Sequence, residues 1–105
     1  MATIQETLTR IKQEIGIPCA YSHFTEPQGV PYIVYIGSGQ TQLDGDNGLT
    51  WRRNTYQIEY YFATKDEDAE REIEDMFLAG GWKFSKSSDS FEPSQGLFVI
   101  FYDVG

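Results

Sequence analysis

PYIVYI (residues 31–36) and TWRRNTYQIEYYF (residues 50–62) decide the fold of this chain. Both are rich in β-branched and aromatic residues and are bounded by Gly, Pro, Asn or Asp, so each predicts a strand. Between them lies GSGQTQLDGDNG (residues 37–48), which is too rich in glycine and polar residues for a helix or a strand. A hairpin needs a loop of only about two to five residues. We therefore expect residues 37–48 to form a long loop with a role outside the fold, mobile in the free subunit and ordered on assembly.

A helix is predicted before these strands. Thr3 and Glu6 have the spacing of a capping box, and Gly16 followed by Pro18 ends the helix. Apolar residues recur with helical periodicity between these signals and form one stripe: Ile4, Leu8, Ile11 and Ile15. Residues 19–24 then predict a short strand, and a turn follows it.

A second, shorter helix is predicted after the central strands. Thr64 and Glu67 again have capping-box spacing, and Gly80 with Gly81 ends the helix. Its inward stripe consists of Ala69, Ile73, Met76 and Phe77. Its acidic residues predict a solvated face rather than a binding site: Asp66, Glu67, Asp68, Glu70, Glu72, Glu74 and Asp75.

Strands at residues 82–86 and 97–102 complete a single domain over residues 1–105. The order α-β-β-β-α-β-β predicts an α+β fold, with a mainly antiparallel sheet and two helices packed on one face. Helices on one face leave the other uncovered, and monomers seldom expose large apolar patches. We expect a partner subunit to cover a second apolar surface drawn from Ile33, Tyr35, Tyr61, Val99 and Phe101.

Charge and composition exclude several classes of function. The chain of 105 residues has a formal net charge of -8, which opposes tight binding to nucleic acid because a phosphate backbone requires clustered Lys and Arg. No apolar run approaches the ~20 residues of a membrane span, and the first residues do not form a signal peptide. The single cysteine, Cys19, cannot form an internal disulfide, which fits synthesis in a reducing cytoplasm.

Two glycine-containing segments resemble ligand-binding loops, but each lacks residues that the loop requires. GSG (residues 37–39) invites a phosphate-loop interpretation, but Gln42 stands where the motif requires glycine, and a strand rather than a helix follows. DGDNG (residues 44–48) resembles the start of a calcium loop, but its third ligand position is glycine and Thr55 occupies the position of the distal glutamate. We expect neither a cofactor nor a metal.

The sequence contains no recognisable catalytic constellation. Cys19 and His23 would share one face of a strand, which suits a thiolate and its base, but no orienting residue or oxyanion donor accompanies them. We therefore predict a packed thiol, a hydrogen-bonded histidine and no enzymatic activity.

Arg52 and Arg53 are the only adjacent basic pair. Strand alternation sends them to opposite faces, so each is expected to pair with an acid rather than to form a patch. Together with Trp51 and Trp82 they are residue types enriched at binding hot spots, whereas partly buried tryptophans are also ordinary in a small core.

Several segments together resemble one family: GIP (16–18), AY (20–21), HF (23–24), Pro27, PYIVY (31–35), GSG (37–39) and YQIEY (56–60). They are similar to the tail-completion, or tail-terminator, proteins of long-tailed bacteriophages and prophages. The resemblance covers most of the chain and carries no catalytic residue. Residues 43–53 lie outside it, so contacts expected there rest on the residues alone.

The resemblance implies a virion protein, made in the host cytoplasm, that forms a ring, commonly hexameric. Such a ring caps the tail tube, contacts the tube protein and the head connector, and lets DNA pass without specific binding. The candidate subunit-interface residues are Gln40, Gln42, Leu43, Asp44, Asp46, Trp51, Arg52, Arg53, Tyr35 and Tyr61. Two alternatives stay open: a head-completion or stopper protein of the same connector, and a monomeric ligand-binding or enzymatic domain.

Overall fold

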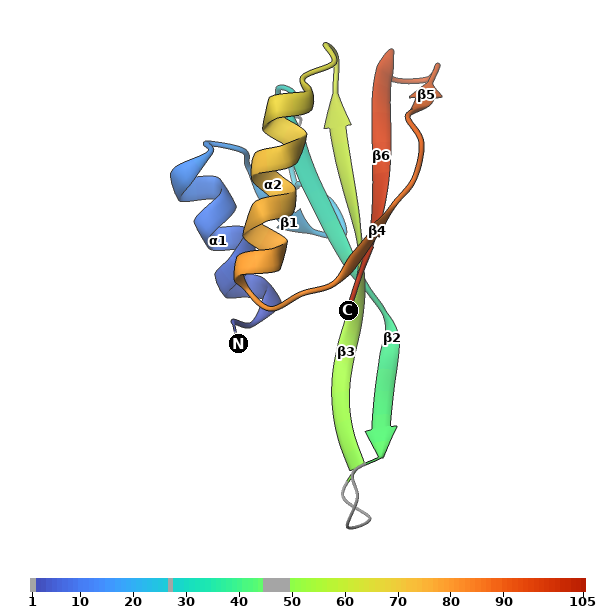
Figure 1. Ribbon diagram of the computed structural model, residues 1–105. Helices are drawn as coiled ribbons and strands as arrows, with labels where there is room; N and C mark the ends of the chain where they lie inside the picture. Colours follow the sequence, from blue (N-terminus) through green and yellow to red (C-terminus); the bar gives the residue numbers. More distant parts are fainter. Residues whose placement is uncertain (1, 27, 45–49) are drawn as a thin grey trace.

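The computed structural model describes residues 2–26, 28–44 and 50–105, which form two helices and a six-stranded sheet (Figure 1). In chain order the elements are α1 (Ile4–Glu14), β1 (Cys19–Tyr21), β2 (Tyr32–Asp44), β3 (Thr50–Phe62), α2 (Glu67–Ala79), β4 (Phe84–Lys86), β5 (Ser90–Glu92) and β6 (Leu97–Val104). The predicted α+β class and order of elements are confirmed, and the three-residue β5 is an addition.

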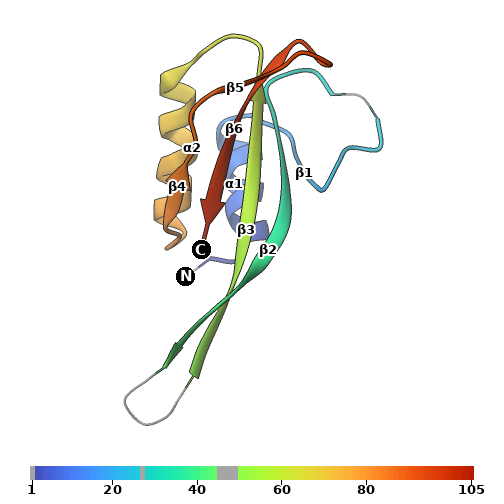
Figure 2. The same cartoon turned by 90° about the vertical axis from the view of Figure 1, so that its right-hand side faces the viewer.

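The sheet is mixed rather than purely antiparallel. Its strand order is β1-β2-β3-β6-β4, and β5 also pairs with β6. β1 runs parallel to β2, with Cys19 opposite Ile33, while the other pairs are antiparallel. The parallel pair arises because the connection between these two strands returns the chain to the end of the sheet where β1 began (Figure 2).

Both helices begin and end with local signals, one of which differs from the prediction. The capping box of Thr3 and Glu6 is present on α1. The N-cap of α2 is Asp66 rather than Thr64: its side chain accepts a hydrogen bond from the Ala69 amide at 3.1 Å. A carboxylate at this position also complements the positive end of the helix dipole, so the helix begins two residues later than predicted.

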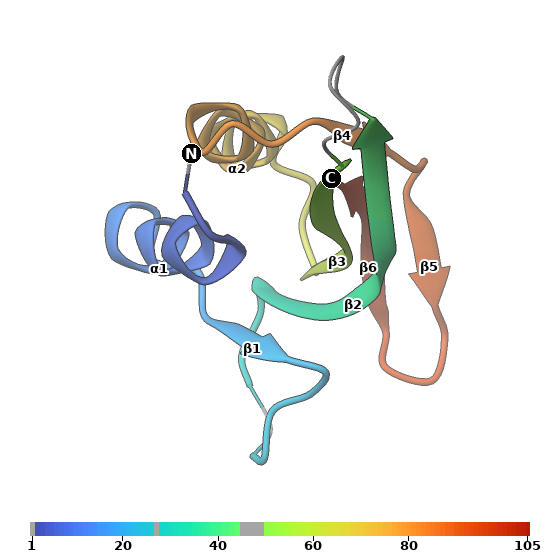
Figure 3. The same ribbon diagram turned by 90° about the horizontal axis from the view of Figure 1, so that it is seen from below.

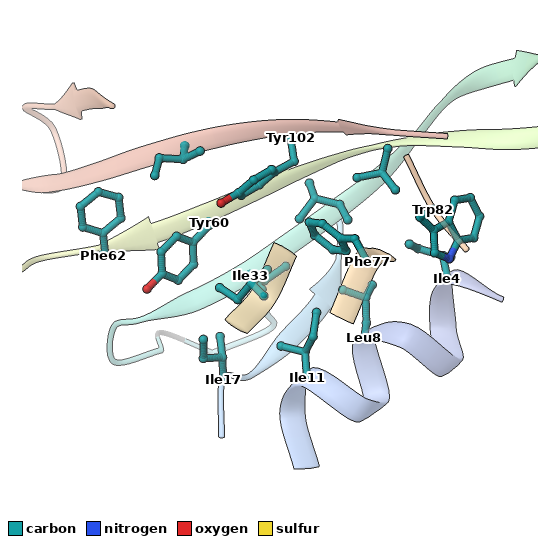
Figure 4. Packing of buried hydrophobic residues seen from close by; sticks show 14 residues of the cluster. Ile4, Leu8, Ile11, Ile17, Ile33, Tyr60, Phe62, Phe77, Trp82 and Tyr102 are labelled. Atoms are coloured by element: carbon teal, nitrogen blue, oxygen red, sulfur yellow. The ribbon is translucent and has the colours of Figure 1, made fainter. Parts of the chain in front are cut away.

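The core lies between the helices and one face of the sheet (Figures 3 and 4). The predicted stripe of α1 is buried at Ile4, Leu8 and Ile11, and α2 contributes Ile73 and Phe77. The sheet contributes alternate residues of its central strands: Ile33, Ile58, Tyr60, Phe62, Ile100, Tyr102 and Val104. This alternation is what the sequence of β3 predicted, with one face turned inward.

Two of the residues predicted for the second apolar surface lie on the other face of the sheet. Ile33 and Tyr35 contact the core on the helix-covered face, so they do not belong to the second surface. Tyr61 and Val99 are register partners that alternate with core residues, which places them on the uncovered face together with Phe101. Val99 is nevertheless fully buried, although it lies on the face that the helices do not cover.

The C-terminus of α2 approaches α1 closely at Gly80. A Cβ atom added there would lie 2.5 Å from Thr7 Oγ1 and 2.9 Å from Trp82 Cδ1. Thr7 and Trp82 are both buried, so neither can easily move away. The next residue, Gly81, has a φ of 81° and lets the amide of Trp82 donate to the carbonyl of Phe77 at 2.9 Å.

Replacing Gly80 with alanine is expected to lower the free energy of unfolding by about 1–3 kcal/mol, because the added methyl overpacks a rigid contact. Denaturant unfolding of Gly80→Ala measures the change. Gly29→Ala is the matched control, since a Cβ at Gly29 meets nothing within 4 Å. Equal stability of the two variants would contradict the close contact.

The largest difference from the sequence prediction concerns residues 37–44, which belong to β2 rather than to a loop. A register shift between Gly37 and Gly39, where Gly39 has a φ of 146°, marks a β-bulge. Beyond it the two strands are joined by polar cross-strand contacts: Ser38 Oγ lies 2.9 Å from Thr55 Oγ1, and Gln40 Nε2 donates to Asn54 Oδ1 at 3.2 Å. Cross-strand pairing thus overrides the low strand propensity of this polar stretch.

Candidate subunit interface

The candidate interface centres on a two-stranded extension of the sheet. β1 pairs only with residues 33–35 of β2, and β6 pairs only with residues 56–62 of β3. Residues 39–44 and 50–55, here called the ribbon, therefore pair only with each other within the part of the chain that the structure describes (Figure 1). The ribbon gives the molecule a long dimension of 51 Å against 27 and 26 Å. Its outer edges carry unpaired backbone groups, which are able to pair with another chain.

The ribbon carries most of the predicted interface residues. The side chains of Gln40, Gln42 and Arg52 are exposed. Leu43 pairs with Trp51 near its end, and Asp44 pairs with Thr50. Asp46 lies outside the described residues, as does the part of the predicted loop over residues 45–49.

Arg53 turns back onto its own domain instead of pairing with an acid. Its guanidinium carbon lies 3.6 Å from the centroid of the Trp82 ring, and its Nη1 donates to the Gly81 carbonyl at 3.1 Å. Burial lowers the pKa of Arg53. Arg53 forms no ion pair with any acid whose side chain the structure describes, so the predicted pairing is wrong for Arg53 over that part of the chain. The pairing predicted for Arg52 is not decided, because the side chain of its neighbour Asp44 lies outside the described ones. Arg53 instead fastens the base of the ribbon to the end of α2.

Tyr35 and Tyr61 lie on opposite faces of the sheet. Tyr35 packs between Tyr21 and Tyr56 on the helix-covered face, at ring-centroid distances of 5.3 and 6.3 Å. Tyr61 lies on the uncovered face, where its hydroxyl donates to Glu59 Oε1 at 3.0 Å. Burial raises the pKa of Tyr61, and this hydrogen bond raises it further. Both side chains are half-buried, so another subunit could reach part of each, on opposite faces of the sheet.

A hollow of about 420 Å³ lies on this uncovered face, between the sheet and the connection from β1 to β2. The rings of Tyr32 and Tyr61 stack with centroids 5.0 Å apart, and Phe24 meets Tyr32 edge-on at 5.6 Å. The hollow is lined by residues that include His23, Phe24, Glu26, Tyr32, Tyr61 and Gln95. Its aromatic walls and polar rim make it a candidate binding surface, which sequence reasoning missed because its parts come from separate segments.

The structure also contains an ionic network around one buried carboxylate, with partly exposed lysines. Glu70 is 1% exposed and lies between two lysines: Lys65 Nζ is 2.7 Å from its Oε2, and Lys86 Nζ is 2.8 Å from its Oε1. Lys86 also contacts Glu74, which accepts from the Tyr102 hydroxyl at 2.8 Å. The predicted solvated face is wrong for Glu70. Its spacing from Ile73 and Phe77 places it on the buried stripe, and that periodicity was the available signal.

Cys19 and His23 do not share one face of a strand, as the sequence had suggested. β1 ends at Tyr21, and Ser22 has a φ of 64°, so His23 leaves the strand. Cys19 packs against the core, with Sγ 3.5 Å from the Ile17 carbonyl oxygen. His23 is exposed, and its Nδ1 lies 3.2 Å from Ser22 Oγ.

Burial raises the pKa of the Cys19 thiol to about 12. The thiolate is the reactive form, so at pH 8 the folded protein should react with DTNB more slowly than the unfolded protein, on the order of a thousandfold. Stopped-flow absorbance with and without urea measures both rates. Rapid native reaction would show that the thiol is accessible and ionised.

Among the described residues, no three His, Cys, Asp or Glu side chains are grouped to hold a metal ion. GSG (residues 37–39) lies within β2 and does not precede a helix, and Asp44 is the last residue of that strand. No helix over the described ranges is long and apolar enough to span a membrane.

No known protein family matches this sequence, and no curated protein matches it significantly.

Proposed function

We propose that this chain is a structural subunit of the tail-terminator ring of a long-tailed bacteriophage or prophage. Its sequence segments resemble that family, as described above. The observation that carries the proposal is the ribbon, which extends away from the core and has open edges (Figure 2). A two-stranded ribbon is only marginally stable by itself, so pairing or packing with a neighbouring subunit would increase its stability. The protein then caps the tail tube and joins it to the head connector.

A ring requires head-to-tail contacts in which two different surfaces of the subunit meet. The ribbon supplies one surface, with Gln40, Gln42 and Arg52 exposed on it. The uncovered sheet face supplies a second, with Tyr61 and the aromatic hollow. Arg53 and Tyr35 act from within the subunit: Arg53 holds the base of the ribbon, and Tyr35 packs against the core.

The charge of the chain agrees with this role. Its net charge of -8 disfavours lasting contact with DNA phosphates, which suits a channel through which DNA must pass. No chemical step is required of the subunit, because capping a tube needs only binding surfaces.

Deleting the gene from a prophage that encodes this chain tests the role. Without a cap the tail tube has no defined end, so we expect tails of irregular length that remain separate from heads. Electron microscopy of induced lysates shows both features, and expression of the protein in trans should restore complete particles. Tails of normal length and form beside DNA-leaking heads would instead identify a head-completion protein.

A further inference from the structure

The aromatic hollow on the uncovered face has the chemistry of a site for a planar cation. Tyr32, Tyr61 and Phe24 provide three neighbouring rings. Glu26 lines the same hollow and is exposed. Aromatic faces attract a cation, and a carboxylate beside them binds a guanidinium through paired hydrogen bonds. An arginine side chain satisfies both requirements, because its planar group stacks as well as donates.

A second carboxylate lies next to the hollow. Glu59 is on the same face of β3 as Tyr61 and accepts the tyrosine hydroxyl at Oε1. Its other oxygen has no hydrogen bond or ion pair over residues 2–26, 28–44 and 50–105. The rings and the two acids therefore form a negatively charged recess on a protein that is already acidic, and an approaching cation is attracted to it.

Arg52 is the side chain that matches this recess. It is exposed on the ribbon. The neighbouring Arg53 is already held by Trp82 and Gly81, so Arg52 is the arginine that the ribbon presents at its surface.

The recess of the same subunit is out of reach of Arg52. Tyr61 lies nine positions after Arg52 along β3, which corresponds to about 30 Å along an extended strand. The ribbon also leaves the sheet at the end opposite the connection from β1 to β2 (Figure 2). A contact between Arg52 and the hollow must therefore join two copies of the chain.

We propose that Arg52 on the ribbon of one subunit packs against the aromatic side chains of the hollow in the next subunit, where Glu26 and Glu59 balance its charge. This inference rests on the proposed ring. It gives the ring a direction, because the donor and the acceptor surfaces differ and each copy carries both.

Cross-linking between two single-cysteine proteins tests the contact directly. Arg52→Cys and Glu26→Cys are each made in a Cys19→Ser background, mixed in equal amounts, assembled on tails and treated with a short bismaleimide, because side chains of this length hold their Cα atoms too far apart for a disulfide. We expect a cross-linked dimer in the mixture and none when either protein is assembled alone. Arg10→Cys, an exposed arginine on α1, replaces Arg52→Cys as the matched control and should give no cross-link with Glu26→Cys.

Substitutions measure the energetic contribution of the contact. Arg52→Ala should weaken subunit association by about tenfold or more, and Arg52→Lys should recover only part of it, because an ammonium does not stack as a guanidinium does. Tyr32→Ala should weaken association similarly. Tyr21→Ala is its control, since Tyr21 is more exposed than the half-buried Tyr32 and lies outside the hollow. Arg52→Glu should prevent assembly, and Glu26→Arg in the same chain should restore it.

The outcomes separate this inference from the proposed function. A closed ring on tails without the cross-link from position 52 to position 26 overturns the inference and leaves the ring in place. Cross-linking of Arg52→Cys to itself would mean a two-fold contact and also overturns it. Absence of the protein from tails overturns both.

Discussion

Replacing Lys65 and Lys86 together with methionine is expected to lower the free energy of unfolding by about 3 kcal/mol. The two lysines are the ion partners of Glu70, whose side chain is 1% exposed. Methionine keeps the aliphatic cover over the carboxylate but removes both charges, so Glu70 remains buried and uncompensated. Chemical denaturation at neutral pH measures the loss.

The control for this prediction removes the carboxylate as well. Adding Glu70→Leu to the double variant should return the stability to within about 1 kcal/mol of the original protein, since a buried ion pair contributes little more than a hydrophobic replacement. Arg10→Met breaks an exposed pair with Glu14 at 2.9 Å and should change stability by less than about 1 kcal/mol. A double variant as stable as Arg10→Met would mean that water reaches Glu70.

Shortening the ribbon is expected to abolish assembly while the subunit stays folded. Because residues 37–44 are strand rather than loop, paired residues must be removed from both strands to keep the register. Joining Thr41 to Arg53 through an Asn-Gly turn removes residues 42–52 and retains the Arg53 contact with Trp82. The core lies elsewhere, so the stability of the variant should change little.

Two measurements are needed on the shortened protein. Thermal unfolding followed by circular dichroism shows whether the domain is intact, and complementation of a gene deletion shows whether complete particles form. We expect an intact domain and a loss of at least several orders of magnitude in infectious particles. Unchanged particle yield would exclude a role for the ribbon in assembly.

Features that depend only on residues close together in the chain could be predicted from the sequence. The capping box of Thr3 and Glu6 and the inward stripe of α1 are confirmed, and so is the alternation along β3. These signals depend on residues within one or two turns or on a period of two, so no knowledge of distant partners is required. The same local rule misplaced the start of α2, because Thr64 and Asp66 are both good caps and only the packed structure selects between them.

The sequence alone determined the class of the domain, the order of its main elements, the acidic charge and most of the residues that face the core. Only the tertiary structure decided that residues 37–44 pair as a strand, that Glu70 is buried between Lys65 and Lys86, that Arg53 stacks on Trp82, and that separate segments enclose an aromatic hollow. The physical reason is the distance along the chain between the partners. Pairing energy, desolvation and stacking depend on which residues meet in space, and a polar stretch forms a strand or a loop according to the partner that lies beside it.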